Sequence, residues 1–199
     1  MTRADLGRLS GWAFILGSFS FATILSNSDP VAFPGSVISS ILLAVGVLGL
    51  RARYGEHAGS FGRNILLLGA IGPILLWIFI ASMYVVYRSG AITDSQVQSQ
   101  GLWIWIYGGP AISLLGLTLF GLTALHSKPL PQLNWLPVFA GIWYPIFYFF
   151  LAGYLFTHNG VYPVHYQTAF DIMHLTQFLA LCAFGASLIT DAPHEMAAA

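Results

Sequence analysis

The sequence predicts an all-α integral membrane protein with six transmembrane helices. Of its 199 residues, 57% are hydrophobic and only 7% are charged, whereas a soluble domain carries about a quarter charged residues. So few charged side chains cannot cover a water-exposed surface, and lipid must therefore be the solvent for most of the chain. Short polar turns separate the apolar runs, and the whole chain, residues 1–199, is predicted to form a single membrane domain.

The predicted spans follow from the length of each apolar run. A bilayer offers the backbone no hydrogen-bonding water, so the spans must be helices. About 20 apolar residues are needed to cross the hydrocarbon core. Allowing for extension at their ends, the predicted spans are 11–28, 34–53, 64–87, 102–125, 134–157 and 166–190.

The first span begins with the charge pattern of a secretory signal peptide. Arg3 and Arg8 precede an apolar run that opens at Trp12. The run continues to Leu25, and polar residues follow it instead of a small-residue cleavage motif, so we interpret it as a retained helix. The second span contains the short charge-free run Ser36–Leu50, which reaches a membrane-crossing length when it is extended at both ends.

Two of the longer spans contain a proline near the middle. These are Pro73 in the third span and Pro145 in the fifth. A proline inside a helix removes one backbone hydrogen bond and kinks the helix. In a membrane, a neighbouring helix can satisfy the backbone group that is freed. We interpret both residues as packing kinks, with a hinge as the alternative. The sixth span follows Pro163, which suits the first turn of a helix.

Basic residues are distributed unequally between the two ends of the predicted spans. With six spans, both termini and the loops after the second and fourth spans lie on one side. That side holds Arg3, Arg8, Arg51, Arg53, Arg63 and Lys128, whereas the other side holds Arg88. Basic residues favour the cytoplasmic ends of spans. Both termini are therefore predicted to be cytoplasmic, with the protein in the cytoplasmic (inner) membrane.

A weak internal repeat accompanies this arrangement. A shift of two spans along the chain pairs Gly69 with Gly141 and Pro73 with Pro145. Three helical hairpins in tandem account for this pattern, and so does composition bias among apolar helices. The repeat is parallel, which is less indicative of alternating-access transport than an inverted repeat.

Several functional classes are excluded or disfavoured by the sequence. The net charge is zero and the basic residues form no aromatic-interleaved patch, so nucleic acid is not an expected partner. The one cysteine, Cys182, can form neither an internal disulfide nor a CxxC redox or zinc motif. The sequence also lacks the GxSxG, HExxH and P-loop signatures.

Polar side chains inside the spans gather in the half of the bundle predicted to face outward. The first two spans place there Ser20, Thr23, Asn27, Ser36, Ser39 and Ser40. Because polar groups are costly in lipid, this distribution predicts a polar pocket that opens toward the outer face.

The stretch that joins the last two spans holds the strongest candidate for chemistry. At 100° per residue, Gln167, Asp171 and His174 share one stripe of the last helix, and Asp171 and His174 are close enough to form a pair. Tyr154 and His158 lie on the preceding span, which is expected to be its antiparallel neighbour. These five residues form the predicted polar site.

Four interpretations of this site are open. His158, Asp171 and His174 are suitable ligands for a metal ion, although their spacing matches no standard motif. Proton donors and acceptors at these positions also suit a quinone or a lipid headgroup, and His174 could serve as an axial haem ligand. In the structural interpretation, Asp171 and His174 form a satisfied polar pair that locks the last helix to its neighbours.

The sequence therefore favours a non-catalytic subunit or a small-ligand-binding protein of a membrane assembly. The alternatives are a membrane-bound redox or metal-dependent enzyme that uses the Asp–His pair, and a small-solute transporter. The expected partners are the lipid bilayer and either other membrane subunits or further copies of this chain, because small residues such as Gly116 and Gly185 permit close helix contacts.

Overall fold

A computed structural model describes residues 3–22, 29–90, 102–128, 130, 134–158 and 164–196. Within these residues the chain forms six α-helices. They are α1 (Arg3–Ala22), α2 (Asp29–Tyr54), α3 (Gly59–Arg88), α5 (Leu102–Ser127), α6 (Leu136–Thr157) and α7 (Tyr166–Met196). The predicted all-helical fold is thus confirmed, and each helix overlaps one predicted span. The largest difference at a helix start is in α1, which begins at Arg3 and so carries its charged residues in its first turns.

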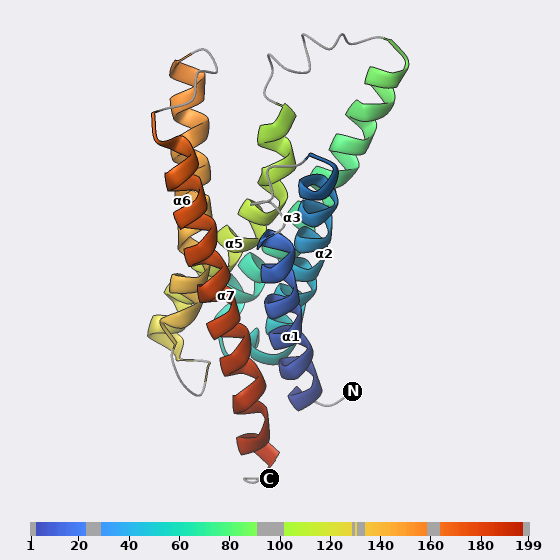
Figure 1. Ribbon diagram of the computed structural model, residues 1–199. Helices are drawn as coiled ribbons and strands as arrows, with labels where there is room; N and C mark the ends of the chain where they lie inside the picture. Colours follow the sequence, from blue (N-terminus) through green and yellow to red (C-terminus); the bar gives the residue numbers. More distant parts are fainter. Residues whose placement is uncertain are drawn as a thin grey trace.

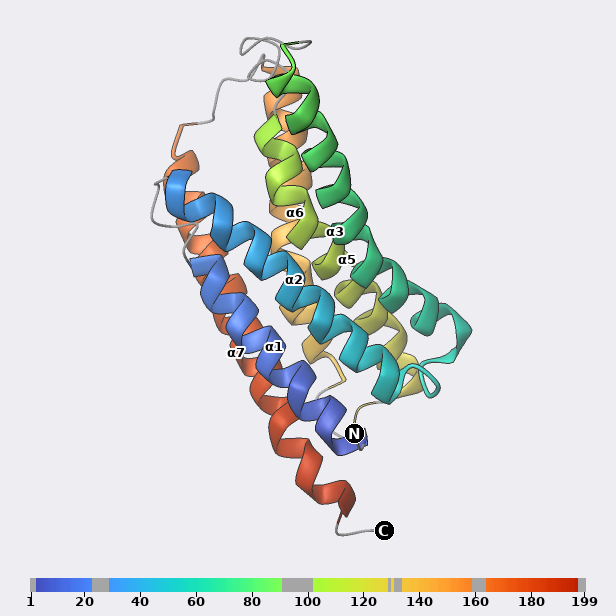
Figure 2. The same ribbon diagram turned by 90° about the vertical axis from the view of Figure 1, so that its right-hand side faces the viewer.

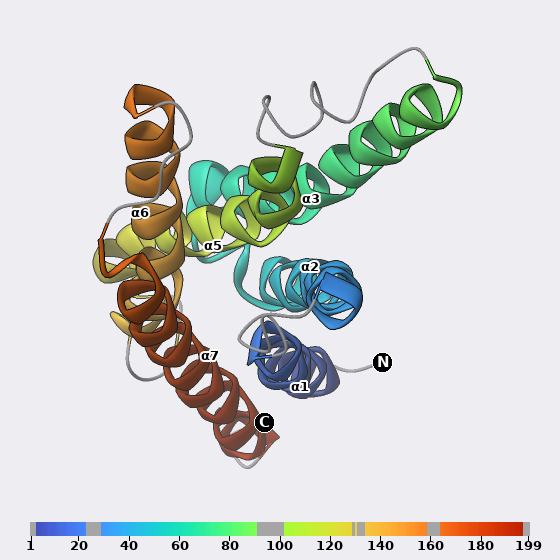
Figure 3. The same ribbon diagram turned by 45° about the horizontal axis from the view of Figure 1, so that its top comes forward.

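The helices form a closed ring (Figures 1 and 3). Each helix packs against its neighbours in the sequence, α1 also packs against α7, and α2 contacts α5. Consecutive helices run in opposite directions, so the N- and C-termini lie at the same end of the bundle (Figures 1 and 2). The end of α2 and the start of α3 lie at this end, as do the end of α5 and the start of α6, whereas the end of α6 and the start of α7 lie at the opposite end.

Three of these helices contain segments long and apolar enough to cross a membrane. These segments are Val37–Tyr54, Gly109–Ser127 and Tyr166–Thr190. Shorter apolar segments occupy Gly59–Leu75 in α3 and Leu136–Leu151 in α6. The helices therefore have the character of a membrane protein, whereas the count of six spans stays a prediction.

The outward-facing side chains of the bundle are also largely apolar. Large hydrophobic residues are exposed on all six helices, including Trp12, Ile41, Leu75, Leu122, Phe150 and Leu179. A soluble monomer seldom exposes so many large apolar side chains. Lipid chains are the natural solvent for it.

Glycines bring the helix backbones close together where helices cross. A Cβ atom added to Gly11 of α1 would lie 2.5 Å from the carbonyl oxygen of Gly185 in α7, and a Cβ added to Gly185 would lie 2.5 Å from that of Gly11. Similarly, a Cβ on Gly116 of α5 would lie 2.7 Å from the Cα of Gly69 in α3. Such small-residue contacts are typical of packing between membrane helices, where backbones approach each other closely.

Buried serines add hydrogen bonds between the helices. The hydroxyl of Ser10 donates to the carbonyl of Gly46 (2.6 Å), and that of Ser39 donates to the carbonyl of Gly17 (3.0 Å). Ser39 is one of the residues of the predicted outward-facing polar pocket, but this bond shows it joining α2 to α1. Of the other residues predicted there, Thr23 and Asn27, together with the side chains of Ser20 and Ser36, lie outside the described residues.

The glycines paired by the proposed repeat have different kinds of neighbour. Gly69 of α3 faces Gly116 of the helix that follows it, α5. Gly141 of α6 faces Thr118 of the helix that precedes it, again α5. A tandem repeat would have placed Gly141 against α7, so these contacts lend the three-hairpin repeat no support and it stays a prediction.

Candidate functional site

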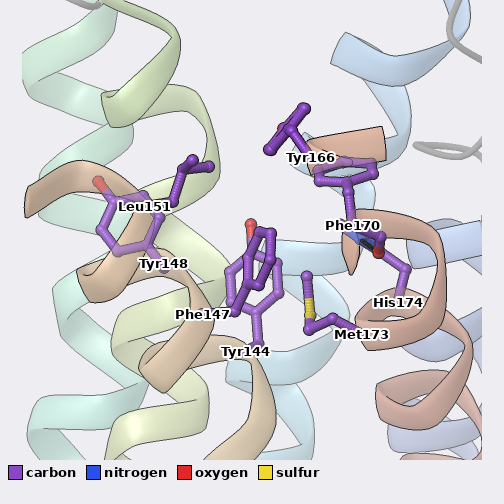
Figure 4. Close-up of a pocket in the computed structure, with 8 residues that line it drawn as sticks. All are labelled: Tyr144, Phe147, Tyr148, Leu151, Tyr166, Phe170, Met173 and His174. Atoms are coloured by element: carbon purple, nitrogen blue, oxygen red, sulfur yellow. Dashed lines mark hydrogen bonds between the residues drawn. The ribbon is translucent and has the colours of Figure 1, made fainter. Parts of the chain in front are cut away.

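The strongest candidate for a site is a small aromatic recess between α6 and α7 (Figure 4). One wall comes from α6 and the other from α7. The lining residues are Tyr144, Phe147, Tyr148, Leu151, Tyr166, Phe170, Met173 and His174. The interior of the recess measures about 10 Å³, which is room for about one water molecule.

His174 is the ionisable side chain of this recess that is most deeply buried, with 1% of its surface exposed. Its Nδ1 lies 2.9 Å from the carbonyl oxygen of Phe170, one turn earlier in α7. A carbonyl oxygen can only accept a hydrogen bond, so Nδ1 is the donor in this contact. In the neutral ring this tautomer leaves Nε2 as an acceptor.

Aromatic rings surround the imidazole of His174. The ring of Phe170 lies 3.9 Å away between centroids, and the ring of Tyr144 meets the imidazole edge to face at 5.7 Å and 85°. Tyr144 in turn stacks on Tyr148, with centroids 6.4 Å apart and planes 12° from parallel. The recess thus combines flat apolar surfaces with a few polar atoms, as small-molecule sites commonly do.

Gln177 lies one turn beyond His174 and is fully buried. Its Oε1 accepts a hydrogen bond from the backbone N–H of Tyr144 (3.1 Å), and its Nε2 donates to the carbonyl oxygen of Ala140. These two backbone groups are four residues apart, so in a regular α-helix they would bond to each other. The amide of Gln177 bridges them just before Pro145.

Gln177 was not among the predicted site residues. The available signal was an amide side chain inside a long apolar run, and such groups are costly in lipid without a partner. What could not be foreseen is that its partner is the backbone of another helix.

Tyr154 and His158 lie near the end of α6 and are not part of the recess lining. Their rings stack on each other, with centroids 3.9 Å apart and planes 5° from parallel. The Nδ1 of His158 lies 2.9 Å from the carbonyl oxygen of Tyr154 and 2.9 Å from Oγ1 of Thr157. His158 is exposed and follows the last residue of α6, so these contacts cap the C-terminal end of that helix.

Gln167 and Asp171 form a pair of their own on an exposed part of α7. The amide nitrogen of Gln167 donates to Oδ1 of Asp171 at 2.9 Å. The predicted pairing of Asp171 with His174 is not among the hydrogen bonds described for these two side chains, and it stays a prediction. The buried imidazole instead uses the carbonyl of Phe170, while the carboxylate stays on the exposed edge with its i−4 neighbour.

The three residues named for a metal ion are not brought together in the structure. His158, Asp171 and His174 all lie in the described part of the chain, where no group of three His, Cys, Asp or Glu residues is placed to hold a metal ion. His158 is at the exposed end of α6, whereas His174 is buried within α7. Of the five predicted site residues, His174 alone lines the recess.

Comparison with protein-family models, with curated proteins and with solved structures finds no match to this chain.

Proposed function

We propose that this chain is a six-span protein of the cytoplasmic membrane with both termini in the cytoplasm. Two features support this arrangement. The termini lie at the same end of the bundle (Figure 2). Most of the basic positions, including Arg8, Arg51, Arg63 and Lys128, belong to that end, whereas Arg88 ends α3 at the other. Basic residues at one end of the spans favour the cytoplasm for that end.

We further propose that the protein is a non-catalytic binding subunit that holds a small lipophilic molecule between α6 and α7. The observation that carries this proposal is the aromatic recess with His174 in its wall. In the proposed topology the recess lies in the outer half of the bilayer. A molecule could then enter it from the lipid, without a path through water.

The lining residues indicate the chemistry of this molecule. The rings of Phe147, Phe170 and the tyrosines offer flat apolar contact. His174 and the tyrosine hydroxyls offer hydrogen bonds to a polar group on the same molecule. The hydroxyl of a quinol headgroup with an apolar tail could donate to Nε2 of His174, and so could a headgroup hydroxyl of a small polar lipid.

The proposal is tested by the small-molecule content of the purified protein. Protein isolated in mild detergent is extracted with organic solvent, and the extract is quantified by mass spectrometry per mole of protein. We expect one lipophilic compound to be enriched in the wild type and depleted in Leu151→Trp, which fills the recess. The matched control is Ile172→Trp, because Ile172 is 61% exposed on the outside of α7.

A milder filling variant guards against loss of the fold. Met173→Phe also adds volume to the recess wall, since Met173 is a lining residue. If neither filling variant loses a compound that the wild type carries, or if the wild type carries none, the binding proposal is wrong.

A further inference from the structure

The helix α6 runs without a break from Leu136 to Thr157, but one hydrogen bond is missing from its backbone beside the recess. Pro145 has no N–H to donate to the preceding turn. Directly before it, the N–H of Tyr144 and the carbonyl of Ala140 are held by the side chain of Gln177 from α7. A proline with an inserted side chain is a recognised cause of helix kinks.

Pro145 divides the α6 wall of the recess. Of the lining residues on α6, Phe147, Tyr148 and Leu151 lie beyond Pro145, whereas Tyr144 lies before it (Figure 4). Movement of the outer segment of α6, residues 146–157, would therefore carry most of that wall with it. The opposite wall, on α7, would stay in place.

The N–H of Tyr144 and the carbonyl of Ala140 can each form a hydrogen bond with either of two partners. They can bond to the amide of Gln177, as in this structure, or to each other as in a regular helix. Exchange between these arrangements leaves neither backbone group unsatisfied, and its cost falls on the released amide of Gln177, which needs a new partner. The released amide would then lie one turn from His174, in reach of a polar group in the recess.

The recess is so small that it must widen before a ligand can enter. With room for about one water molecule, it cannot take a ring-sized ligand as it stands. The segment from Pro145 to Thr157 is about 18 Å long. A tilt of about 20° at Pro145, the size of a marked helix kink, would move its end by about 6 Å.

We propose that Pro145 and Gln177 form a hinge that sets the width of the α6–α7 recess. When the amide of Gln177 is hydrogen-bonded to the backbone of α6, the recess is narrow. When these hydrogen bonds break, the outer segment of α6 tilts away from α7 and the recess becomes wide enough for the ligand. This inference rests on the proposed binding function, because it regulates access to the same recess. Pro145 then acts as a hinge, the alternative to a packing kink.

The hinge is tested by distances between spin labels on ligand-stripped protein in lipid nanodiscs. The outer pair of labels is placed at Thr157 and Thr168, and the inner pair at Phe139 and Ala183; all four positions are exposed. A Cys182→Ala background keeps the native thiol unlabelled. Gln177→Met removes the bridge while preserving the side-chain length, and Pro145→Ala restores the N–H missing from α6.

We expect Gln177→Met to lengthen or broaden the outer-pair distance by several ångströms, and Pro145→Ala to narrow its distribution. The inner pair should not change in either variant. An outer pair unchanged in both variants, or an inner pair that changes with it, overturns the hinge. If Gln177→Met does not fold, the result for Pro145→Ala decides. A narrower distribution of the outer-pair distance supports the hinge, and an unchanged distribution refutes it.

The outcome is separable from that of the binding proposal. The label distances are measured without ligand, whereas binding is judged from the extracted compound. If the outer-pair distance changes as expected but the purified protein carries no compound, the hinge proposal is supported and the binding proposal is wrong.

Discussion

The hydroxyl of Ser113 on α5 donates a hydrogen bond of 2.8 Å to the carbonyl oxygen of Gly69 on α3. Gly69 lies four residues before Pro73, which has no N–H to offer this carbonyl. A side chain from a neighbouring helix thus supplies the bond that the proline removes. Gln177 also bonds the backbone of α6 next to Pro145, but it holds the N–H of Tyr144 and the carbonyl of Ala140, whereas the carbonyl that Pro145 frees is that of Gly141. The expectation that a neighbouring helix satisfies the freed carbonyl is confirmed at Pro73 and stays a prediction at Pro145.

Ser113→Ala should therefore destabilise the bundle. The lost bond joins two helices and leaves the Gly69 carbonyl buried, so we expect a cost of about 0.6 to 1.7 kcal/mol, the range for hydrogen bonds between membrane helices. The measurement is the free energy of unfolding in mixed micelles during a denaturing-detergent titration. Ser82→Ala is the control, because Ser82 is exposed and bonds within its own helix, to Ile78; equal effects of the two changes would contradict this role of Ser113.

A larger effect is expected where α1 crosses α7. Replacing Gly185 with Val places a side chain against the backbone of Gly11, where even a Cβ would lie 2.5 Å from the carbonyl oxygen. Overpacking of this kind costs about 1–3 kcal/mol. Thermal unfolding of the purified protein, followed by the loss of its monodisperse gel-filtration peak, measures the change.

Gly153→Ala provides the comparison for this crossing. A Cβ on Gly153 of α6 meets no atom within 4 Å, so the variant should unfold at or above the wild-type temperature. Wild-type stability in Gly185→Val would show that α1 and α7 do not pack as described.

The proposed orientation predicts the behaviour of reporter fusions. A fluorescent protein fused after residue 199 should fluoresce, because it would fold in the cytoplasm, whereas alkaline phosphatase at the same point should be inactive. Phosphatase inserted after Gly90, beyond the end of α3, should be active. The reverse pattern would place the basic end of the bundle outside and contradict the topology.

The all-helical fold could be predicted from sequence because the composition identifies lipid as the solvent, and lipid restricts the secondary structure. Apolar runs in a bilayer have few alternatives to helices, and the short polar turns set their order. The ends of the helices were less certain, because a helix can continue into water. α1 illustrates this, since its charged first turns at Arg3 and Asp5 carry no hydropathy signal.

The site was harder to predict because helical phase fixes relative directions but not which direction is buried. Gln167, Asp171 and His174 do share a stripe, but the stripe crosses from the exposed surface into the core. Gln167 and Asp171 fall on its exposed part and His174 on its buried part. The bridge made by Gln177 depends on the alignment of two helices, and periodicity within one helix carries no information on that alignment.

The central claim is that the recess beside His174 holds a lipophilic molecule, and its most direct test is chemical. His174→Leu keeps the recess apolar and similar in volume but removes the hydrogen bond expected to hold the polar group. Losing one such bond, worth about 1.4 kcal/mol, lowers affinity about tenfold.

The measurement is the amount of extracted compound per mole of purified protein, for the wild type, for His174→Leu and for His158→Leu. His158 is the matched control, because it is exposed at the end of α6 and outside the recess lining. We predict a loss of about tenfold in His174→Leu at subsaturating ligand, with a folded gel-filtration profile, and wild-type content in His158→Leu. Equal content in all three proteins would contradict the account.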